Sequence, residues 1–215
     1  MNHNKLTRRR LLQLMTITLG AGVLSACGVR QPEIEFIDAS YGEDKMSKKI
    51  LVAYASRAGS TAGVAEAIGK TLAECGASVD VKPVDAITDL SPYDAAVIGS
   101  AIRGGKWLPE GMQFIESHQS ELNKIPCAAF LVCMTMAMKK AQYRAGVAEW
   151  MAPARAILKP VREGTFAGEL DFSKLPFTLD VILLKISSKF GFPTGDHRDW
   201  EAIRNWAEHI NPLLK

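Results

Sequence analysis

Residues 50–61 constrain the fold of this chain more than any other stretch, because an apolar run passes directly into a turn of small and hydroxyl-bearing residues. The run over 50–55 predicts a buried strand, and the residues after the turn predict a helix. Gly59 lets a ligand approach the backbone, and the free N–H groups of the helix favour a phosphate. Neither the Gly-Lys-Ser/Thr of a nucleotide loop nor the Gly-x-Gly-x-x-Gly of a dinucleotide site is present, so a single phosphomonoester is expected. A plain strand-to-helix connection is the alternative. The turn supplies three hydroxyls, from Ser56, Ser60 and Thr61.

Apolar runs later in the chain predict further strands. Residues 95–99 and 126–133 are continuously apolar, as expected for strands buried on both faces. Residues 79–84 alternate and contain Pro83, which favours a place near a sheet edge, and residues 161–168 predict the last strand. Helices are expected over residues 62–74, 108–122 and 141–151, and at the C-terminus from a cap at Asp196 or Asp199. This alternation is typical of an α/β protein.

Two further loops follow buried strands, over residues 100–107 and 133–136. Where the order of parallel strands reverses, the loops after the first and third strands face each other across a crevice, and a ligand is expected there. The two consecutive glycines of the second loop permit sharp backbone turns. Trp107 is expected either to stack on a ligand or to pack in the core. The methionines of the third loop either cover a ligand or pack as ordinary apolar side chains.

The cysteines show no redox or metal pattern. Cys127 and Cys133 lie on one predicted strand, roughly 20 Å apart at ~3.3 Å per residue, so they cannot form a disulfide with each other. We expect them and Cys75 to be small buried side chains. No Cys or His spacing typical of a metal site occurs, and no metal is expected.

Charge and length narrow the class of protein further. The chain has 215 residues, 47% of them hydrophobic, which suits one domain with appendages. It carries 26 basic and 23 acidic residues, but 4 of the basic ones lie in an N-terminal segment without acids, which leaves 22 against 23. A body so near to neutral has no basic stripe, so no nucleic-acid partner is expected. Those four residues are Lys5, Arg8, Arg9 and Arg10.

The N-terminus resembles an export signal. Arg8 and Arg9 precede an apolar run over 15–24, and the sequence Leu-Ser-Ala-Cys ends at Cys27. The paired arginines resemble a twin-arginine signal, and the last four residues resemble a lipobox, which implies lipidation of Cys27 after cleavage. An uncleaved anchor helix is the alternative, although the run is shorter than the ~20 residues of a membrane span. We therefore expect a signal peptide over 1–27 and an exported lipoprotein anchored to a membrane of the bacterial cell envelope.

A tether is expected to join this signal to the folded domain. Residues 28–48 contain Gln-Pro, Gly and several charges, a composition that favours a linker. The folded domain is then expected over residues 49–215. Met46 is an alternative start, and a product that begins there would be a cytoplasmic enzyme.

Residues 169–196 are expected to form an insertion, because they follow the last strand and are not needed for a five-stranded sheet. Apolar residues recur within it at helical spacing: Leu179, Ile182, Leu183, Ile186 and Phe190. Three roles remain open for this stripe. They are packing against the domain, contact with a membrane, and a lid over a hydrophobic substrate.

From Lys49 onward the chain resembles the flavodoxin-domain group that includes the menaquinone-dependent protoporphyrinogen oxidases. Three features carry the resemblance: Ser-Arg-Ala-Gly-Ser-Thr ending at Thr61, Val-Ile-Gly-Ser-Ala-Ile-Arg-Gly ending at Gly104, and Asp-Trp-Glu ending at Glu201 after the insertion. The resemblance implies a flavodoxin-like three-layer α/β/α fold with a five-stranded parallel sheet in the order 2-1-3-4-5. It also implies FMN as the cofactor.

By the same resemblance, three loops contact the cofactor. The first contributes Ser56, Arg57, Ala58, Gly59, Ser60 and Thr61. The second contributes Ser100, Ala101, Ile102, Arg103, Gly104, Gly105 and Trp107. The third contributes Cys133, Met134, Thr135 and Met136, in a place where flavodoxins often have an aromatic residue. No catalytic residue is assigned.

Three functions remain open. The first is an FMN-dependent oxidoreductase or electron carrier at the cell envelope, exchanging electrons with a donor or acceptor such as a quinone. The second is a menaquinone-dependent protoporphyrinogen oxidase, although an exported protein would lie on the wrong side of the membrane for cytoplasmic haem synthesis. The third is a flavodoxin-fold envelope lipoprotein without enzymatic activity, against which the hydroxyls of the first loop argue.

Overall fold

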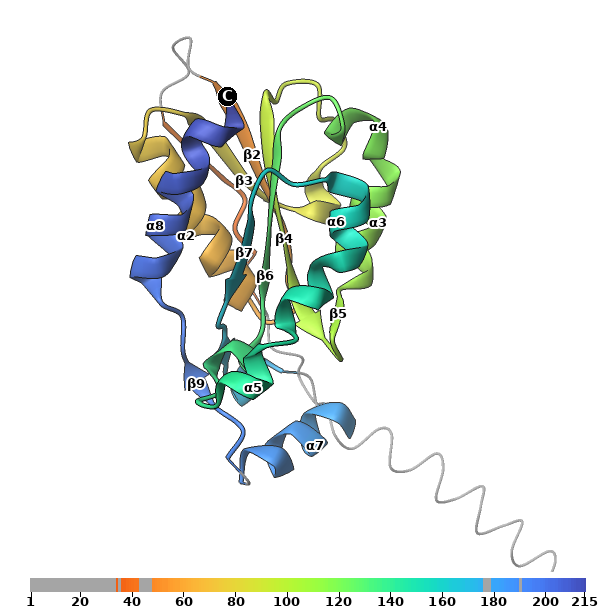
Figure 1. The fold of residues 1–215 in the computed structure, drawn as a ribbon, viewed down its shortest axis with the longest axis vertical. Helices are drawn as coiled ribbons and strands as arrows, with labels where there is room; N and C mark the ends of the chain where they lie inside the picture. The colour runs from red at the N-terminus through yellow and green to blue at the C-terminus, as the bar shows by residue number, and fades with distance from the viewer. Residues whose placement is uncertain (1–33, 35, 43–47, 176–178, 190) are drawn as a thin grey trace, which may run out of the picture. The chain divides into compact units, whose positions relative to one another are not determined.

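Five parallel strands form the centre of this computed structural model, and they lie in the order 2-1-3-4-5 (Figure 1). Their register places Ala55 opposite Ser100 and Ala101 opposite Val132. This arrangement confirms the predicted three-layer α/β/α fold. In spatial order the strands are β3 (Ser78–Pro83), β2 (Lys49–Ala55), β4 (Ala95–Arg103), β6 (Cys127–Val132) and β7 (Glu163–Phe166).

The described part of the chain begins after the expected export signal. The predicted signal peptide, residues 1–27, and its lipidation site Cys27 lie outside the described residues. The residues from 33 onward form one compact unit. The structure describes residues 34, 36–42, 48–175, 179–189 and 191–215.

A short strand that the sequence analysis did not predict extends one edge of the sheet. β1 (Ala39–Tyr41) runs antiparallel to β3, with Ser40 opposite Asp80. Ser40 Oγ donates a hydrogen bond of 2.6 Å to Asp80 Oδ1, and Tyr41 Oη donates one of 2.9 Å to Glu66. The sheet therefore begins within residues 28–48, the range that was expected to be a tether.

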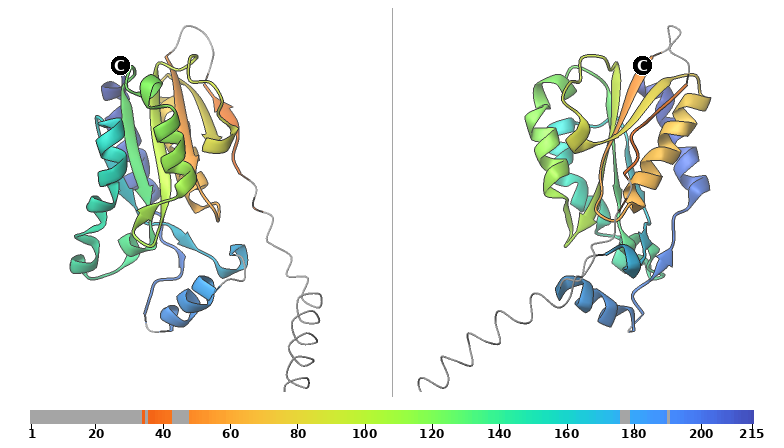
Figure 2. Two further views of the ribbon diagram at one scale, coloured as in Figure 1. Left: turned by 90° about the vertical axis from the view of Figure 1, so that its right-hand side faces the viewer. Right: turned by 180° about the vertical axis from the view of Figure 1, so that it is seen from behind.

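Helices cover both faces of the sheet (Figures 1 and 2). On one face lie α2 (Ser60–Glu74) and α8 (Trp200–Ile210), and α8 continues as a 3-10 turn over Asn211–Leu214. α2 follows the predicted pattern, because its buried apolar residues recur at helical spacing. Asp199, one of the two predicted caps, accepts a 3.0 Å hydrogen bond from the Ala202 N–H at the start of α8. The other face carries α3 (Pro109–Ser117), α4 (Gln119–Leu122) and α6 (Ala152–Leu158).

The core lies in two apolar clusters, one on each face of the sheet. Successive residues of β4 alternate between them, so that Ile98 packs in one cluster and Val97 in the other. Gly99 is a position where a side chain has no room. A Cβ there would lie 2.0 Å from Cζ of Phe130, so the close approach of β6 requires glycine.

Two of the predicted helices are interrupted. The helix expected over 108–122 is divided at His118 into α3 and α4. The prediction of one continuous helix over 141–151 is wrong. These residues form α5 (Ala141–Arg144) and a 3-10 turn over Val147–Met151, which leads directly into α6. Gly146 lies between the two pieces, where the low helix propensity of glycine favours an interruption.

Residues 169–196 leave the sheet and return to it, as expected for an insertion. β8 (Glu169–Leu170) and β9 (Gly195–Asp196) pair antiparallel at its base. Between them, a 3-10 turn (Phe172–Lys174) and α7 (Leu179–Ser188) lie beyond the carboxyl ends of the parallel strands (Figures 1 and 2). Within the described residues, no helix combines the length and the apolar content that a membrane crossing requires.

Candidate functional site

The three predicted loops meet at one edge of the sheet. Parallel strands end at a common edge, and the pairing of Ala55 with Ser100 and of Ala101 with Val132 brings the ends of β2, β4 and β6 side by side. This edge, with the loops that follow β2, β3, β4, β6 and β7, is called the carboxyl edge below. Because the strand order reverses between β2 and β4, it is the expected place for a ligand in an open α/β sheet.

The first loop has the geometry of a phosphate site. Gly59 has a φ of +79°, in the left-handed region that favours glycine, and α2 begins at the next residue. The Gly63 N–H bonds back to Gly59 O at 3.1 Å, while the N–H groups before it belong to the first turn of the helix and point out of its N-terminus. Residues 56–62 contain hydroxyls and amides but no carboxylate. This donor set fits a phosphate group.

The three hydroxyl residues of the first loop have different surroundings. Thr61 is buried at the start of α2, and Ser56 is half-buried at the end of β2. Ser60 Oγ accepts a 2.7 Å hydrogen bond from the Glu169 N–H, so this hydroxyl also holds the start of the insertion. A Cβ on Gly168 would lie 3.0 Å from Ser60 Oγ, which shows how closely the two segments pack. The first loop therefore supports both the predicted phosphate site and the base of the insertion.

Arg57 reaches away from the first loop and joins it to α3. Its Nε and one terminal nitrogen each lie 3.2 Å from an oxygen of Glu110, which stands in the first turn of α3. Burial alone would raise the pKa of Glu110, but the hydrogen bond and charge of Arg57 outweigh burial and lower it. The sequence analysis placed Arg57 on the cofactor and did not single out Glu110. In this structure the guanidinium binds that carboxylate.

The second loop is a β-hairpin, and its sharp turn lies at the two glycines where the sequence analysis expected backbone turns. β4 continues to Arg103, and β5 (Lys106–Trp107) pairs back with it. Gly104 and Gly105 form the two-residue turn, with φ values of +59° and +75°. Ala101 and Ile102 are half-buried, and Arg103 and Gly104 are exposed at the tip.

Two predicted contact residues of the second loop are turned into the protein. Ser100 is fully buried, and its Oγ accepts a 3.0 Å hydrogen bond from the Leu108 N–H and donates one of 2.8 Å to Ala101 O. Trp107 is 5% exposed and packs in the cluster beside α3, so of its two expected roles the structure shows core packing. Its Nε1 is a buried donor without a partner in the described part of the chain. Trp150, which the sequence analysis did not single out, lies against the hairpin turn at Gly105.

The third loop is a 3-10 turn over Met134–Ala137. Met134, Thr135 and Met136 are half-buried, and Met136 packs against the same cluster as Trp107. Cys133 is buried at the end of β6, and burial raises the pKa of its thiol. Burial likewise raises the pKa of Cys127 to about 12, so neither thiol is a thiolate at neutral pH. The predicted loop therefore lies at the carboxyl edge, with Cys133 on its buried side.

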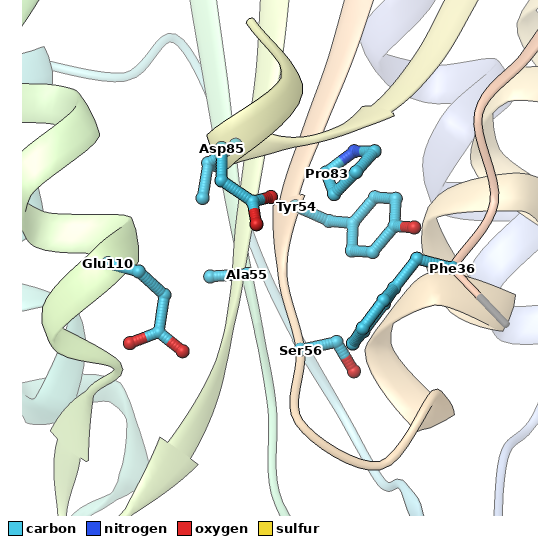
Figure 3. A pocket seen from close by; sticks show the side chains of 8 residues that line it. Phe36, Tyr54, Ala55, Ser56, Pro83, Asp85 and Glu110 are labelled. Carbon is cyan, nitrogen blue, oxygen red and sulfur yellow. The ribbon is translucent and has the colours of Figure 1, made fainter. Parts of the chain in front are cut away.

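A small pocket opens between the ends of β2 and β3 (Figure 3). The ring of Phe36, just before β1, stands beside Ser56, and the carboxylates of Asp85 and Glu110 lie across from it. Tyr54 Oη donates a 2.9 Å hydrogen bond to Ile37 O, which holds this N-terminal segment in place. The pocket has a volume of about 60 Å³, room for a few water molecules and too little for a flavin ring.

Arg198 organises the return of the insertion, a role that the sequence analysis missed. One terminal nitrogen lies 2.7 Å from Asp196 and 3.3 Å from Glu169, and its guanidinium lies 4.5 Å from the ring centre of Trp200. The hydrogen bond from Arg198 lowers the pKa of Asp196 to about 2. The sequence shows charged residues around Arg198, but it does not show that Arg198 binds Glu169, which lies 29 residues earlier in the chain. Among the described residues, no group of His, Cys, Asp and Glu side chains is arranged to hold a metal ion.

The sequence of this chain is similar to one protein family and to two proteins of known function. The flavodoxin domain family matches residues 51–191 of this chain. Protoporphyrinogen IX dehydrogenase (quinone) of Escherichia coli strain K12 is 28% identical over 178 residues, which cover 77% of this chain and 96% of that protein. A protein of the same name from Leishmania major is 27% identical and covers 78% of this chain and 76% of that protein.

A solved structure shows the same fold. Oxidised Flavodoxin 1 from Bacillus cereus matches with a TM-score of 0.50 and 16% identity, covering 78% of this chain and all of that one. The family match spans well over half of the chain, and the first loop lies where the strand order reverses. The chain therefore belongs to the flavodoxin domain family, as an FMN-binding oxidoreductase.

Proposed function

We propose that this protein exchanges electrons with a quinone from the outer side of the cytoplasmic membrane, where a lipid on Cys27 holds it. The observation that carries the redox part is the meeting of the three loops at the carboxyl edge, at the switch point of the sheet. The quinone part is supported by the relatives named above, which share 178 aligned residues with this chain. The export part is supported by the paired arginines and the Leu-Ser-Ala-Cys sequence.

Each of the three loops would contact a different part of the cofactor or its electron partner. When bound, FMN supplies the transfer of one or two electrons with the accompanying protons. The first turn of α2, with Ser56 and Thr61, would hold the phosphate through amide and hydroxyl donors. Gly104, at the hairpin tip, offers an open backbone position, since nothing lies within 4 Å of a Cβ built on it, whereas Trp150 lies against the neighbouring Gly105. The methionines of the third loop offer an apolar surface on which a hydrophobic electron partner can pack.

An anaerobic assay tests the quinone part. Purified protein, loaded with FMN and reduced with dithionite, is mixed with a soluble menaquinone analogue, and flavin reoxidation is followed by absorbance. We expect fast reoxidation that saturates with quinone concentration. Free FMN at the same concentration is the control, because it reacts without a binding site. Reoxidation no faster than that of free FMN, or without saturation, would show that the protein offers the quinone no site.

The relatives favour one substrate for the reducing half of the reaction. Protoporphyrinogen IX is the compound in their names, and their matches cover most of this chain. To test this substrate, protoporphyrinogen replaces dithionite in the same assay, and the fluorescence of protoporphyrin is measured. Quinone-dependent formation of the porphyrin supports this substrate. If the quinone reacts with the dithionite-reduced protein but no porphyrin forms, the protein is a quinone-linked flavoprotein with another donor.

Export and lipidation are tested in cells. Arg8→Lys with Arg9→Lys is expected to retain the protein inside, because twin-arginine export depends on the arginine pair. Cys27→Ser removes the thiol that accepts the lipid, so labelled fatty acid is expected on the wild type and not on this variant. Cys75→Ser is the matched control, since Cys75 lies outside the lipobox and is exposed, contrary to the expectation that it is buried. Wild-type protein without labelled fatty acid would contradict the anchor, and export of the double-lysine variant would contradict the twin-arginine route.

A further inference from the structure

The N-terminal segment enters the sheet at the carboxyl edge. β1 is antiparallel to β3, with Ala39 opposite Val81, so the residues before β1 lie near the ends of the parallel strands. Contacts fix them there: Ile37 O accepts the Tyr54 hydrogen bond, and Lys82 Nζ lies 3.6 Å from Asp38. A Cβ on Gly59 would lie 3.5 Å from the side chain of Ile34, so this segment also packs on the first loop.

This entry point limits how far the carboxyl edge can lie from an anchor at Cys27. Ile34 already packs on the first loop, so only residues 28–33 separate it from Cys27, and a chain of that length spans at most about 25 Å. The tether thus keeps the edge near a membrane surface, but it does not by itself decide which side of the domain faces that surface. The apolar and basic side chains of the carboxyl edge indicate which side faces the membrane.

Exposed apolar side chains gather at the carboxyl edge. In the described residues, the exposed large apolar side chains are Phe36, Tyr143, Val161, Leu183, Ile186 and Leu213. Four of the six lie on segments at this edge, namely the lead-in to β1, α5 and α7. Leu183 is 56% exposed and Ile186 is 47% exposed, and they stand one turn apart on α7, where i and i+3 share a face. Phe190, which the sequence placed on the same stripe, lies outside the described residues.

The same segments carry a surplus of positive charge. Exposed basic side chains occur on or beside α5 and α7, at Lys139, Lys140, Arg144, Lys185 and Lys189. In the part of the chain that the structure describes, none of the five forms an ion pair with a carboxylate. Three acids of the edge, Glu110, Glu169 and Asp196, are bound to Arg57, Arg198 or Lys174. The sequence of α7 contains one acid, Asp180, and the loop after β3 contains Asp85, so basic residues still outnumber acids on and beside α5 and α7. Basic and apolar side chains interleaved on a short helix are typical of a segment that lies in the headgroup region of an anionic bilayer.

We infer that the carboxyl edge docks on an anionic lipid surface through Leu183, Ile186 and the lysines of α7. The apolar pair enters the headgroup region, and Lys185 and Lys189 bind lipid phosphates. This docking turns the flavin loops toward the bilayer, where a membrane-dissolved quinone can reach them. The inference deepens the proposed function and rests on its lipid anchor for proximity, but the docking contact itself is a property of α7.

The test uses full-length acylated protein in vesicles of phosphatidylcholine with and without phosphatidylglycerol. A Cys75→Ser background leaves the other described cysteines buried, so a fluorophore attaches selectively to Leu183→Cys. Leu213→Cys is the matched control, because Leu213 is 42% exposed and lies after α8 at the opposite edge. We expect a quencher on the lipid acyl chains to quench the label at position 183 and not at 213, and more strongly with phosphatidylglycerol. Lys185→Gln and Lys189→Gln should each reduce the ratio of docked to undocked protein about fivefold, since a lysine at an anionic surface contributes about 1 kcal/mol.

Each outcome separates docking from anchoring. If the protein floats with the vesicles while the label at position 183 stays unquenched, the anchor stands and the docking is overturned. If the protein does not float with the vesicles, neither the lipid nor α7 attaches it to them, and the anchor and the docking are both overturned. Equal quenching at positions 183 and 213 would overturn a defined orientation. Quenching at 183 that neither phosphatidylglycerol nor the lysine variants change would overturn the role of charge.

Discussion

The first and second loops of the site resemble each other in sequence and differ in what the fold leaves available. Both follow a buried strand, and both combine glycine with a hydroxyl residue. In the first loop, residues 56–61, the backbone opens at Gly59 and the start of α2 presents amides. In the second, residues 100–107, the strand continues into a hairpin, and both Ser100 and Trp107 are buried. Residue type and spacing therefore locate a loop at a site, while hydrogen-bond partners decide which side chains a ligand can meet.

The comparison is tested most strongly at the hydroxyls of the first loop. Ser56→Ala with Thr61→Val removes two hydrogen bonds to a charged phosphate, worth ~1.5–3 kcal/mol each, so the affinity for FMN should fall a hundredfold or more. Fluorescence titration of the apoprotein measures this. Thr61→Ser keeps the hydroxyl and serves as the control. If the double variant bound FMN as tightly as the wild type, the first loop would be a plain strand-to-helix connection.

Ser100 should show the opposite behaviour. Ser100→Ala leaves the buried Leu108 N–H without its 3.0 Å partner, which costs about 1–3 kcal/mol of folding free energy. Urea unfolding should detect this loss, while the dissociation constant of FMN stays close to the wild-type value. A variant with normal stability and weakened FMN binding would mean that the buried hydroxyl contacts the cofactor, and the contrast between the loops would disappear.

Substitutions in the turn of the hairpin should change the folding free energy by a smaller amount. Gly104 has a φ of +59° and open space around it, so Gly104→Ala should destabilise the protein by about 1 kcal/mol through backbone strain alone. Gly104→Asn should be nearly neutral, because asparagine adopts this conformation readily. Thermal or urea unfolding of the two variants measures the difference. Equal stability of the alanine and asparagine variants would argue against a strained two-residue turn.

The smallest effect concerns the contact between the first loop and α3. Arg57 and Glu110 have side chains that are 52% and 35% exposed, so solvent screens their ion pair. A double-mutant cycle with Arg57→Ala and Glu110→Ala should give a coupling free energy of roughly 0.2–1 kcal/mol that declines with added salt. FMN affinity is the second measurement. If Arg57→Ala weakened FMN far more than Glu110→Ala, Arg57 would contact the cofactor, as the sequence analysis expected.

The strands were predictable where both faces are covered. The apolar runs over 95–99 and 126–133 correspond to β4 (Ala95–Arg103) and β6 (Cys127–Val132), since continuous apolar runs are required between two layers of helices. β1 carries no such signal, because its three residues are held by pairing with β3 and by the Ser40 contact to Asp80. The hairpin at Gly104 and Gly105 does carry one. Two consecutive glycines between residues of strand propensity favour a tight hairpin turn, and the sequence analysis predicted the turn but not the pairing of Ile102 with Trp107.

The site was less predictable than the fold, because its partners are distant in sequence. The position of the first loop follows from the apolar run before Ser56 and the helix after it. The bonds of Ser60 to residue 169 and of Arg198 to Glu169 join the insertion to the sheet, and no local pattern specifies such pairs. Whether Trp107 faces a ligand or the core was left open by its position before a helix, and packing against α3 decided it.

Strand β1 also has a consequence for self-association. It covers the outer backbone of β3, whose buried Val79 and Val81 alternate along a segment of high strand propensity. Without β1, the N–H and C=O groups of that edge would be free to pair with another molecule. A product that begins at Met46 would lack β1, because the strand ends at Tyr41. Such a product should aggregate more readily than the longer chain, so three residues upstream of the parallel sheet protect its solubility.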